Sequence, residues 1–172
     1  MNARTLAVAL TASLFATGLA AQTVEPGLWE FTSSNMQVDG QPLPDLQEML
    51  GAMAPEQRQM MEQMMLDSGV QLGTQGIRVC LTEEQAQADE LPLYDPESDC
   101  RQEITERGAD HWAFRFDCPD AKGEGEVRFS GRRAFTTRVE STLDVGSETQ
   151  RGSMETHARW IQADCGDVRP VE

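Results

Sequence analysis

Side chains that could carry catalysis are sparse in this sequence. Its 172 residues contain only two histidines, His111 and His157, which lie far apart in the chain. No nucleophile elbow, zinc-binding His-Glu-x-x-His pattern or phosphate-binding glycine loop accompanies them. The 29 acidic residues are too many for any pair of them to stand out. We therefore expect no catalytic residue and no cofactor, and we treat both histidines as polar side chains of surface strands or turns.

One group of acidic residues has the spacing of a calcium loop. It occupies the first, third, fifth, ninth and twelfth places of an EF-hand pattern: Asp95, Glu97, Asp99, Glu103 and Glu106. The sixth place, which requires glycine for a sharp turn, is Cys100, and Pro96 also opposes the loop geometry. We expect a solvated acidic loop and no metal site.

Methionine is concentrated in one segment. Six of the nine methionines fall within it: Met49, Met53, Met60, Met61, Met64 and Met65. Thioether side chains can fill irregular gaps in a core, form an adaptable binding surface, or capture Cu(I). Copper capture usually needs a nearby histidine or cysteine, and the segment has neither. Core packing and a partner surface therefore remain the two main alternatives.

The candidate ligand or partner surface consists of Met60, Met61, Met64 and Met65. In a helix, residues 60 and 64 share one stripe, whereas residues 61 and 65 are turned from it by about 100°. The first stripe continues the apolar period of the preceding helix, so we expect it to face the sheet. Met61 and Met65 should then be the more exposed pair.

The four cysteines predict two disulfides. Their spacings are long and include no Cys-x-x-Cys pair, which argues against a zinc site or a redox motif. The segments 100–107 and 111–118 have the pattern of two strands, and a hairpin centred on Ala109 places Cys100 opposite Cys118. Cys80–Cys165 follows by elimination.

The first 21 residues have the pattern of a secretory signal. Arg4 precedes an uncharged run that ends in small residues, and this run is too short and too polar to span a bilayer. The formal net charge of −15 disfavours nucleic acid and anionic membrane surfaces as partners. We expect a periplasmic or secreted protein without a membrane span, with one domain over residues 22–172.

The remaining pattern predicts an α+β, mainly β domain. Strands are expected near 24–38, 77–81, 100–107, 111–118, 124–130, 134–143 and 153–163, with two short helices at about 45–53 and 55–67. About seven strands in an antiparallel meander could form a curved sheet, a sandwich or an open barrel. Trp29 and Trp160 should bring the first and last strands into one core.

Several segments resemble a family of small exported bacterial proteins known only as a domain of unknown function (three-six-one-seven). They are the opening Pro26-Gly27-Leu28-Trp29-Glu30, the segment Cys80-Leu81-Thr82-Glu83-Glu84, the Cys100/Cys118 spacing and the closing Arg159-Trp160-Ile161-Gln162-Ala163-Asp164-Cys165-Gly166. Family members often have proline in place of Glu83. The resemblance implies an exported, mainly β fold and no activity.

The favoured function is a non-enzymatic periplasmic binding or interaction module. Its ligand, an unknown protein, peptide or small apolar molecule, would contact the methionine-lined helices or the concave face of the sheet. One alternative is an envelope hydrolase or isomerase whose acidic residues converge only in the fold. Another is a structural or stress-related envelope protein.

Overall fold

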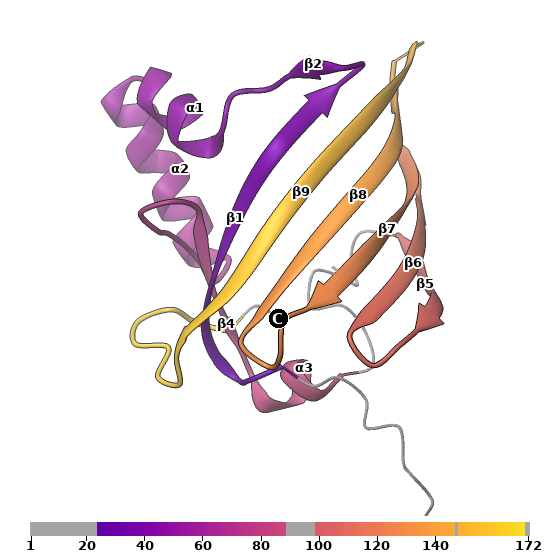
Figure 1. Cartoon of the computed structure of the whole chain (residues 1–172). Helices are drawn as coiled ribbons and strands as arrows, with labels where there is room; N and C mark the ends of the chain where they lie inside the picture. The colour runs from indigo at the N-terminus through magenta and orange to yellow at the C-terminus, as the bar shows by residue number, and fades with distance from the viewer. Residues whose placement is uncertain (1–23, 89–98, 147, 171–172) are drawn as a thin grey trace, which may run out of the picture.

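The chain forms one antiparallel sheet of nine strands that remains open (Figure 1). The computed structural model describes residues 24–88, 99–146 and 148–170. The strands are β1 (Gly27–Val38), β2 (Gln41–Pro42), β3 (Val70–Leu72), β4 (Ile77–Leu81), β5 (Arg101–Arg107), β6 (His111–Cys118), β7 (Ala121–Phe129), β8 (Ala134–Val145) and β9 (Glu148–Gln162). Their order is β3-β4-β1-β9-β8-β7-β6-β5, and β2 pairs with β1 outside this path. The expected mainly β, antiparallel fold is confirmed, and of the three architectures left open it takes the form of one open sheet. Strands β2 and β3, which were not expected, span only two and three residues.

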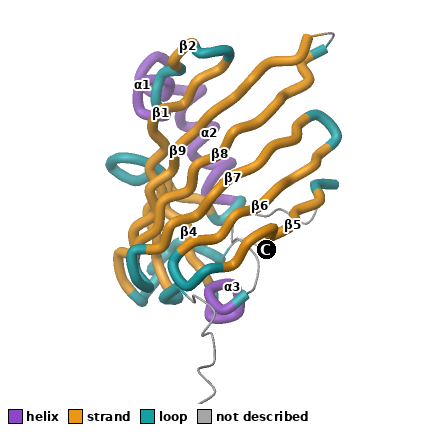
Figure 2. The backbone as a smooth tube through the Cα atoms, turned by 45° about the vertical axis from the view of Figure 1, so that its right-hand side comes forward, coloured by secondary structure: helices purple, strands orange, loops and turns teal. Residues whose placement is uncertain are grey.

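The two expected helices lie in the chain between β2 and β3. Helix α1 (Leu46–Ala52) begins after Asp45, whose side chain and that of Glu48 form a reciprocal capping box. Helix α2 (Pro55–Asp67) begins at a proline, which suits the first helical turn, and ends before Gly69 at φ +79°. Figure 1 shows both helices beside β1 and β4, and Figure 2 shows the short helix α3 (Glu83–Gln87) at the other end of the sheet.

The predicted hairpin register is confirmed over most of β5 and β6. Arg101 pairs with Asp117 and Ile104 with Phe114, as a hairpin centred on Ala109 requires. A bulge between Ile104 and Glu106 shifts the pairing by one residue nearer the turn. Both predicted disulfides form, with Cα–Cα separations of 4.1 Å for Cys100–Cys118 and 5.6 Å for Cys80–Cys165.

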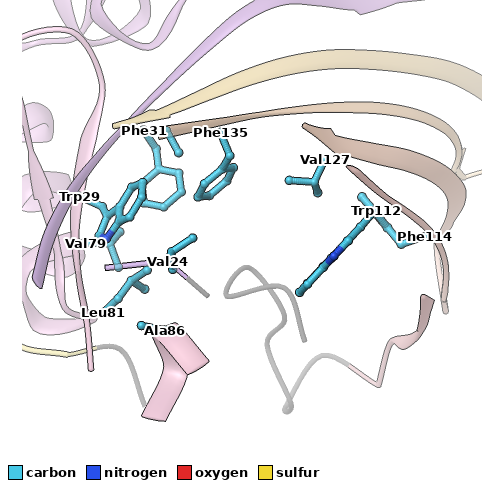
Figure 3. Close-up of a cluster of buried hydrophobic side chains, with 11 residues drawn as sticks. Val24, Trp29, Phe31, Val79, Leu81, Ala86, Trp112, Phe114, Val127 and Phe135 are labelled. Atoms are coloured by element: carbon cyan, nitrogen blue, oxygen red, sulfur yellow. The ribbon is translucent and has the colours of Figure 1, made fainter. Parts of the chain in front are cut away.

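The hydrophobic core lies on the concave, inner face of the sheet (Figure 3). Alternate residues of the strands point to this face, among them Trp29, Phe135 and Trp112. The Trp29 and Phe135 rings lie 5.4 Å apart, and α3 contributes the buried side chain of Ala86. Trp29, which is 0 % exposed, is the largest fully buried side chain among the described residues.

Two glycines let aromatic rings lie across the neighbouring strand. A Cβ atom at Gly125 would lie 2.5 Å from the Phe114 ring, and one at Gly123 would lie 2.8 Å from the Phe116 ring. Real Cβ atoms do not approach this closely, so any larger residue would displace the rings. Gly123 and Gly125 therefore allow β6 to pack its phenyl groups over β7.

Trp29 and Trp160 join the first and last strands, as expected. They are directly opposite each other on β1 and β9. The Trp29 indole donates a hydrogen bond to the Glu25 carbonyl at 2.8 Å, and that of Trp160 donates to the Pro26 carbonyl at 3.0 Å. Trp160 is only partly buried, and the Arg133 guanidinium lies 4.4 Å from its ring centre.

We predict that Trp29→Ala lowers the free energy of unfolding by about 3–5 kcal/mol, because it leaves a large cavity between the two halves of the sheet. Urea denaturation measures the loss. Met64→Ala, at an exposed site on α2, is the control and should change stability by less than about 0.5 kcal/mol. Equal effects of the two substitutions would contradict the role of the buried Trp29 side chain in stabilising the core.

Candidate functional site

The helices α1 and α2, which we call the helical arm, bury almost nothing. Leu50 is the one buried side chain of α1, and α2 has none. Met60 and Met64 are 64 % and 65 % exposed, and Met49 of α1 and Met53, the residue directly after α1, are also exposed. All four methionines therefore leave apolar thioether side chains open to solvent.

The expected order of exposure within α2 is wrong. Met61 and Met65 are half-buried, whereas Met60 and Met64 are exposed. Helical spacing separates the two stripes correctly, but the neighbouring elements decide which of them faces the protein. Here α2 lies beside β3, a three-residue strand that the sequence pattern did not reveal.

The base of the arm is fixed by the C-terminal segment. The Arg169 guanidinium donates to the Asp67 carbonyl at 3.1 Å and to the Leu66 carbonyl at 3.5 Å, at the end of α2 where carbonyl groups lack helical partners. Val168 is buried against Cys80, whose disulfide to Cys165 joins this segment to β4. The arm is thus attached at its base while its methionines remain exposed.

The arm is acidic as well as apolar. Residues 45–67 contain five acidic side chains and one basic side chain: Asp45, Glu48, Glu56, Glu62 and Asp67 against Arg58. The Arg58 guanidinium lies 3.8 Å from the Glu62 carboxylate, one helical turn away. The surface therefore combines thioethers with excess negative charge.

The outer face of the sheet is polar and has mixed charge. An open hollow of about 780 Å³ lies over six strands, β1 and β5 to β9, and eight charged residues line it: Arg101, Arg115, Lys122, Arg151, Glu103, Asp117, Glu124 and Glu140. Four basic and four acidic groups balance one another, and neither histidine lines the hollow. Opposite charges on adjacent strands, such as Arg115 and Glu124 at 3.9 Å, fit a solvated surface.

Both histidines pair with carboxylates on this outer face. His111 lies 3.5 Å from Glu126, and His157 lies 2.9 Å from Glu155. Arg138 stands between the two carboxylates, 3.8 Å from Glu126 and hydrogen-bonded to Glu155. The sequence did not reveal this row of charged side chains, because its members lie on four different strands, β6 to β9, and only the register brings them together.

Arginines hold these carboxylates in the charged form. The hydrogen bond from Arg128 lowers the pKa of Glu126, and the hydrogen bond from Arg138 lowers the pKa of Glu155. The same contact with Glu155 raises the pKa of Arg138. A general acid needs a raised carboxyl pKa, so this arrangement suits structural ion pairing better than proton transfer.

Sequence analysis also missed a buried charge. Alternation along β1 placed Glu30 on the face opposite Trp29, which usually indicates exposure. Instead its side chain is 4 % exposed, between Arg159 at 2.9 Å and Arg78 at 3.5 Å. A Cβ at Gly73 would lie 2.7 Å from the Glu30 carboxylate, so the loop before β4 covers the pair.

The described residues include no group of three or more histidine, cysteine, aspartate or glutamate side chains placed to hold a metal ion. Two of the residues in the calcium-like spacing, Asp95 and Glu97, lie outside the described residues. Glu103 and Glu106 lie in β5, on either side of its bulge. In the same described ranges, no helix is long and apolar enough to cross a membrane.

Comparison with known proteins agrees with the resemblance noted in the sequence. A family described as "Protein of unknown function (DUF3617)" matches residues 24–165. The chain belongs to the DUF3617 family. A relative in Pseudomonas putida, described as "Uncharacterized protein in lpd-3 5'region", is 50 % identical over 121 residues, which cover 69 % of this chain and 85 % of that protein. No solved structure matches the chain significantly.

We predict that mild peroxide oxidises Met60 and Met64 of this DUF3617 protein first and leaves the fold intact, because neither side chain is buried. Peptide mapping after limited treatment identifies the sulfoxides, and circular dichroism reports the fold. Earlier oxidation of Met61 and Met65, or uniform protection of all four, would contradict the exposed stripe.

A second prediction concerns acid stability. Hydrogen bonds from Arg128 and Arg138 lower the pKa values of Glu126 and Glu155, so their ion pairs stabilise the fold above the ordinary carboxyl pKa and cease to do so as pH falls through the lowered pKa values. Urea midpoints should therefore decline as pH falls below about 5. Arg138→Gln should flatten this decline, whereas Arg151→Gln, which removes a charge elsewhere on the outer face, should not. Identical pH profiles for wild type and Arg138→Gln would refute the assignment.

Proposed function

We propose that this protein is an exported, non-enzymatic interaction module whose helical arm contacts its partner. The observation that carries the proposal is the exposure of α2, a helix of 13 residues that buries no side chain and leaves Met60 and Met64 about two-thirds exposed. A helix that served only to pack the core would turn these side chains inward. Flexible thioethers at the surface are typical of binding sites that adapt to a partner.

Export is supported by the redox state and by the signal-like start of the chain. Two disulfides and no free cysteine among the described residues are typical of an oxidising compartment. The first 21 residues have the pattern of a cleavable signal. A periplasmic location for a bacterial protein follows from this part of the proposal.

A binding role is better supported than a hydrolase or isomerase. The enzyme alternative needs acidic residues that converge with different proton affinities. The two carboxylates with resolved shifts, Glu126 and Glu155, are both lowered by arginines, and they lie outside the charged hollow. A purely structural role would leave the arm without a specific contact, which an experiment can test directly.

Site-specific photo-crosslinking in the native periplasm provides the test. A photoreactive amino acid replaces Met64 in one variant and Val145 in another; both positions are exposed and apolar, but Val145 lies at the end of β8, away from the arm. We expect a discrete adduct from position 64, weakened by Met60→Gln, and none of the same mass from position 145. No adduct at position 64, or the same adducts at both positions, would overturn the proposal.

A further inference from the structure

Building on the proposed function, we infer that the arm binds a basic amphipathic helix of another polypeptide. Glu56, Met60, Met64 and Asp67 follow one another along α2 at spacings of four, four and three residues. Such spacing places all four on one face of a helix, and all four are exposed. This face, which we call the methionine stripe, has two thioethers at its centre and a carboxylate at each end.

The dimensions of the stripe suit a helical partner. From Glu56 to Asp67 the helix advances about 16 Å, which is roughly three turns. A partner helix with an apolar face about three turns long and basic residues at both ends would match the thioethers and both carboxylates. Amphipathic helices recognise apolar surfaces in this way, and flanking charges fix their position and speed encounter.

Negative charge around the stripe supports a cationic occupant. Residues 45–67 have four more acidic than basic side chains, in a chain whose formal net charge is −15. This charge repels anionic lipid headgroups and nucleic acid. It also opposes arm-to-arm association of two copies, because each arm would present the same carboxylates. A basic partner gains attraction from the same field.

The attachment of α2 at its C-terminal end also supports a binding role for the methionine stripe. Arg169 binds the last carbonyls of α2, and Asp67 itself lies 3.8 Å from that guanidinium while remaining about two-thirds exposed. The stripe is therefore held on the protein without being covered by any described element. A helix presented in this way loses little conformational entropy when it binds.

Binding of three synthetic peptides to the full-length, oxidised protein tests the inference. The first is an amphipathic helix of about 18 leucine and lysine residues. The second has glutamate in place of every lysine, and the third has the composition of the first in an order without an apolar face. Fluorescence anisotropy measures affinity at about 50 mM and about 300 mM salt.

We expect the basic amphipathic peptide to bind at least about tenfold more tightly than either control, and more weakly at the higher salt concentration. Equal binding of the acidic peptide would overturn the charge assignment, and equal binding of the reordered peptide would overturn the helical one. No binding of the basic amphipathic peptide would overturn the whole inference.

Matched variants locate the binding site. Glu56→Gln with Asp67→Asn, or Met60→Gln with Met64→Gln, should weaken binding of the first peptide by about tenfold. Glu124→Gln with Glu140→Gln removes the same charge from the outer face and should leave the affinity unchanged. Circular dichroism checks that every variant is folded. Equal losses in the arm and outer-face variants would show nonspecific attraction and overturn the site.

The two experiments separate the two proposals. A native adduct at position 64, together with failure of the basic peptide to bind, would overturn the partner chemistry and support the arm as an interaction surface. Absence of that adduct would overturn the proposed function itself, whatever the peptides do.

Discussion

The whole structure depends on the position of β1 between β4 and β9. This strand, near the start of the described chain, pairs with β4 on one side and with the last strand on the other. Without β1, strands β3 and β4 would not be hydrogen-bonded into the same sheet as the meander from β5 to β9. Trp29 and Phe31 supply the side chains that hold this junction, since both are buried and both contact Phe135.

The position of the helical arm depends on the pairing of β1 with β4 and β9. Pairing of β1 with β9 brings the end of β9 close to β4, where Cys165 bonds to Cys80. The disulfide directs the following residues across β4, so that Val168 is buried and Arg169 reaches the end of α2. A contact between residues more than one hundred positions apart therefore anchors the base of the surface that we propose to be functional.

Features set by local chemistry could be predicted from the sequence, and features set by tertiary contacts could not. Asp45 and Pro55 mark the helix starts because capping is a property of a few neighbouring residues. The hairpin register followed from the symmetry of its two strands, and both disulfides followed from it. The exposed methionine pair was assigned wrongly, because a three-residue strand beside α2 decides which stripe is covered. Glu30 was missed for a similar reason: the loop that buries it comes from more than forty residues further along the chain.

The distribution of charge explains why the arm differs from the rest of the surface. On the outer face of the sheet, register places basic and acidic residues on adjacent strands, and the hollow there has equal numbers of both. On such a face the basic and acidic side chains neutralise one another. Among the described residues, the face exposes no large apolar group. On the inner face, aromatic side chains pack against one another in the core. In the arm, an excess of acidic over basic side chains and exposed thioethers occur together. Neither kind of group stabilises the isolated protein, since the carboxylates repel one another and the thioethers remain in water. Contact with a partner that is both basic and apolar would stabilise both kinds of group.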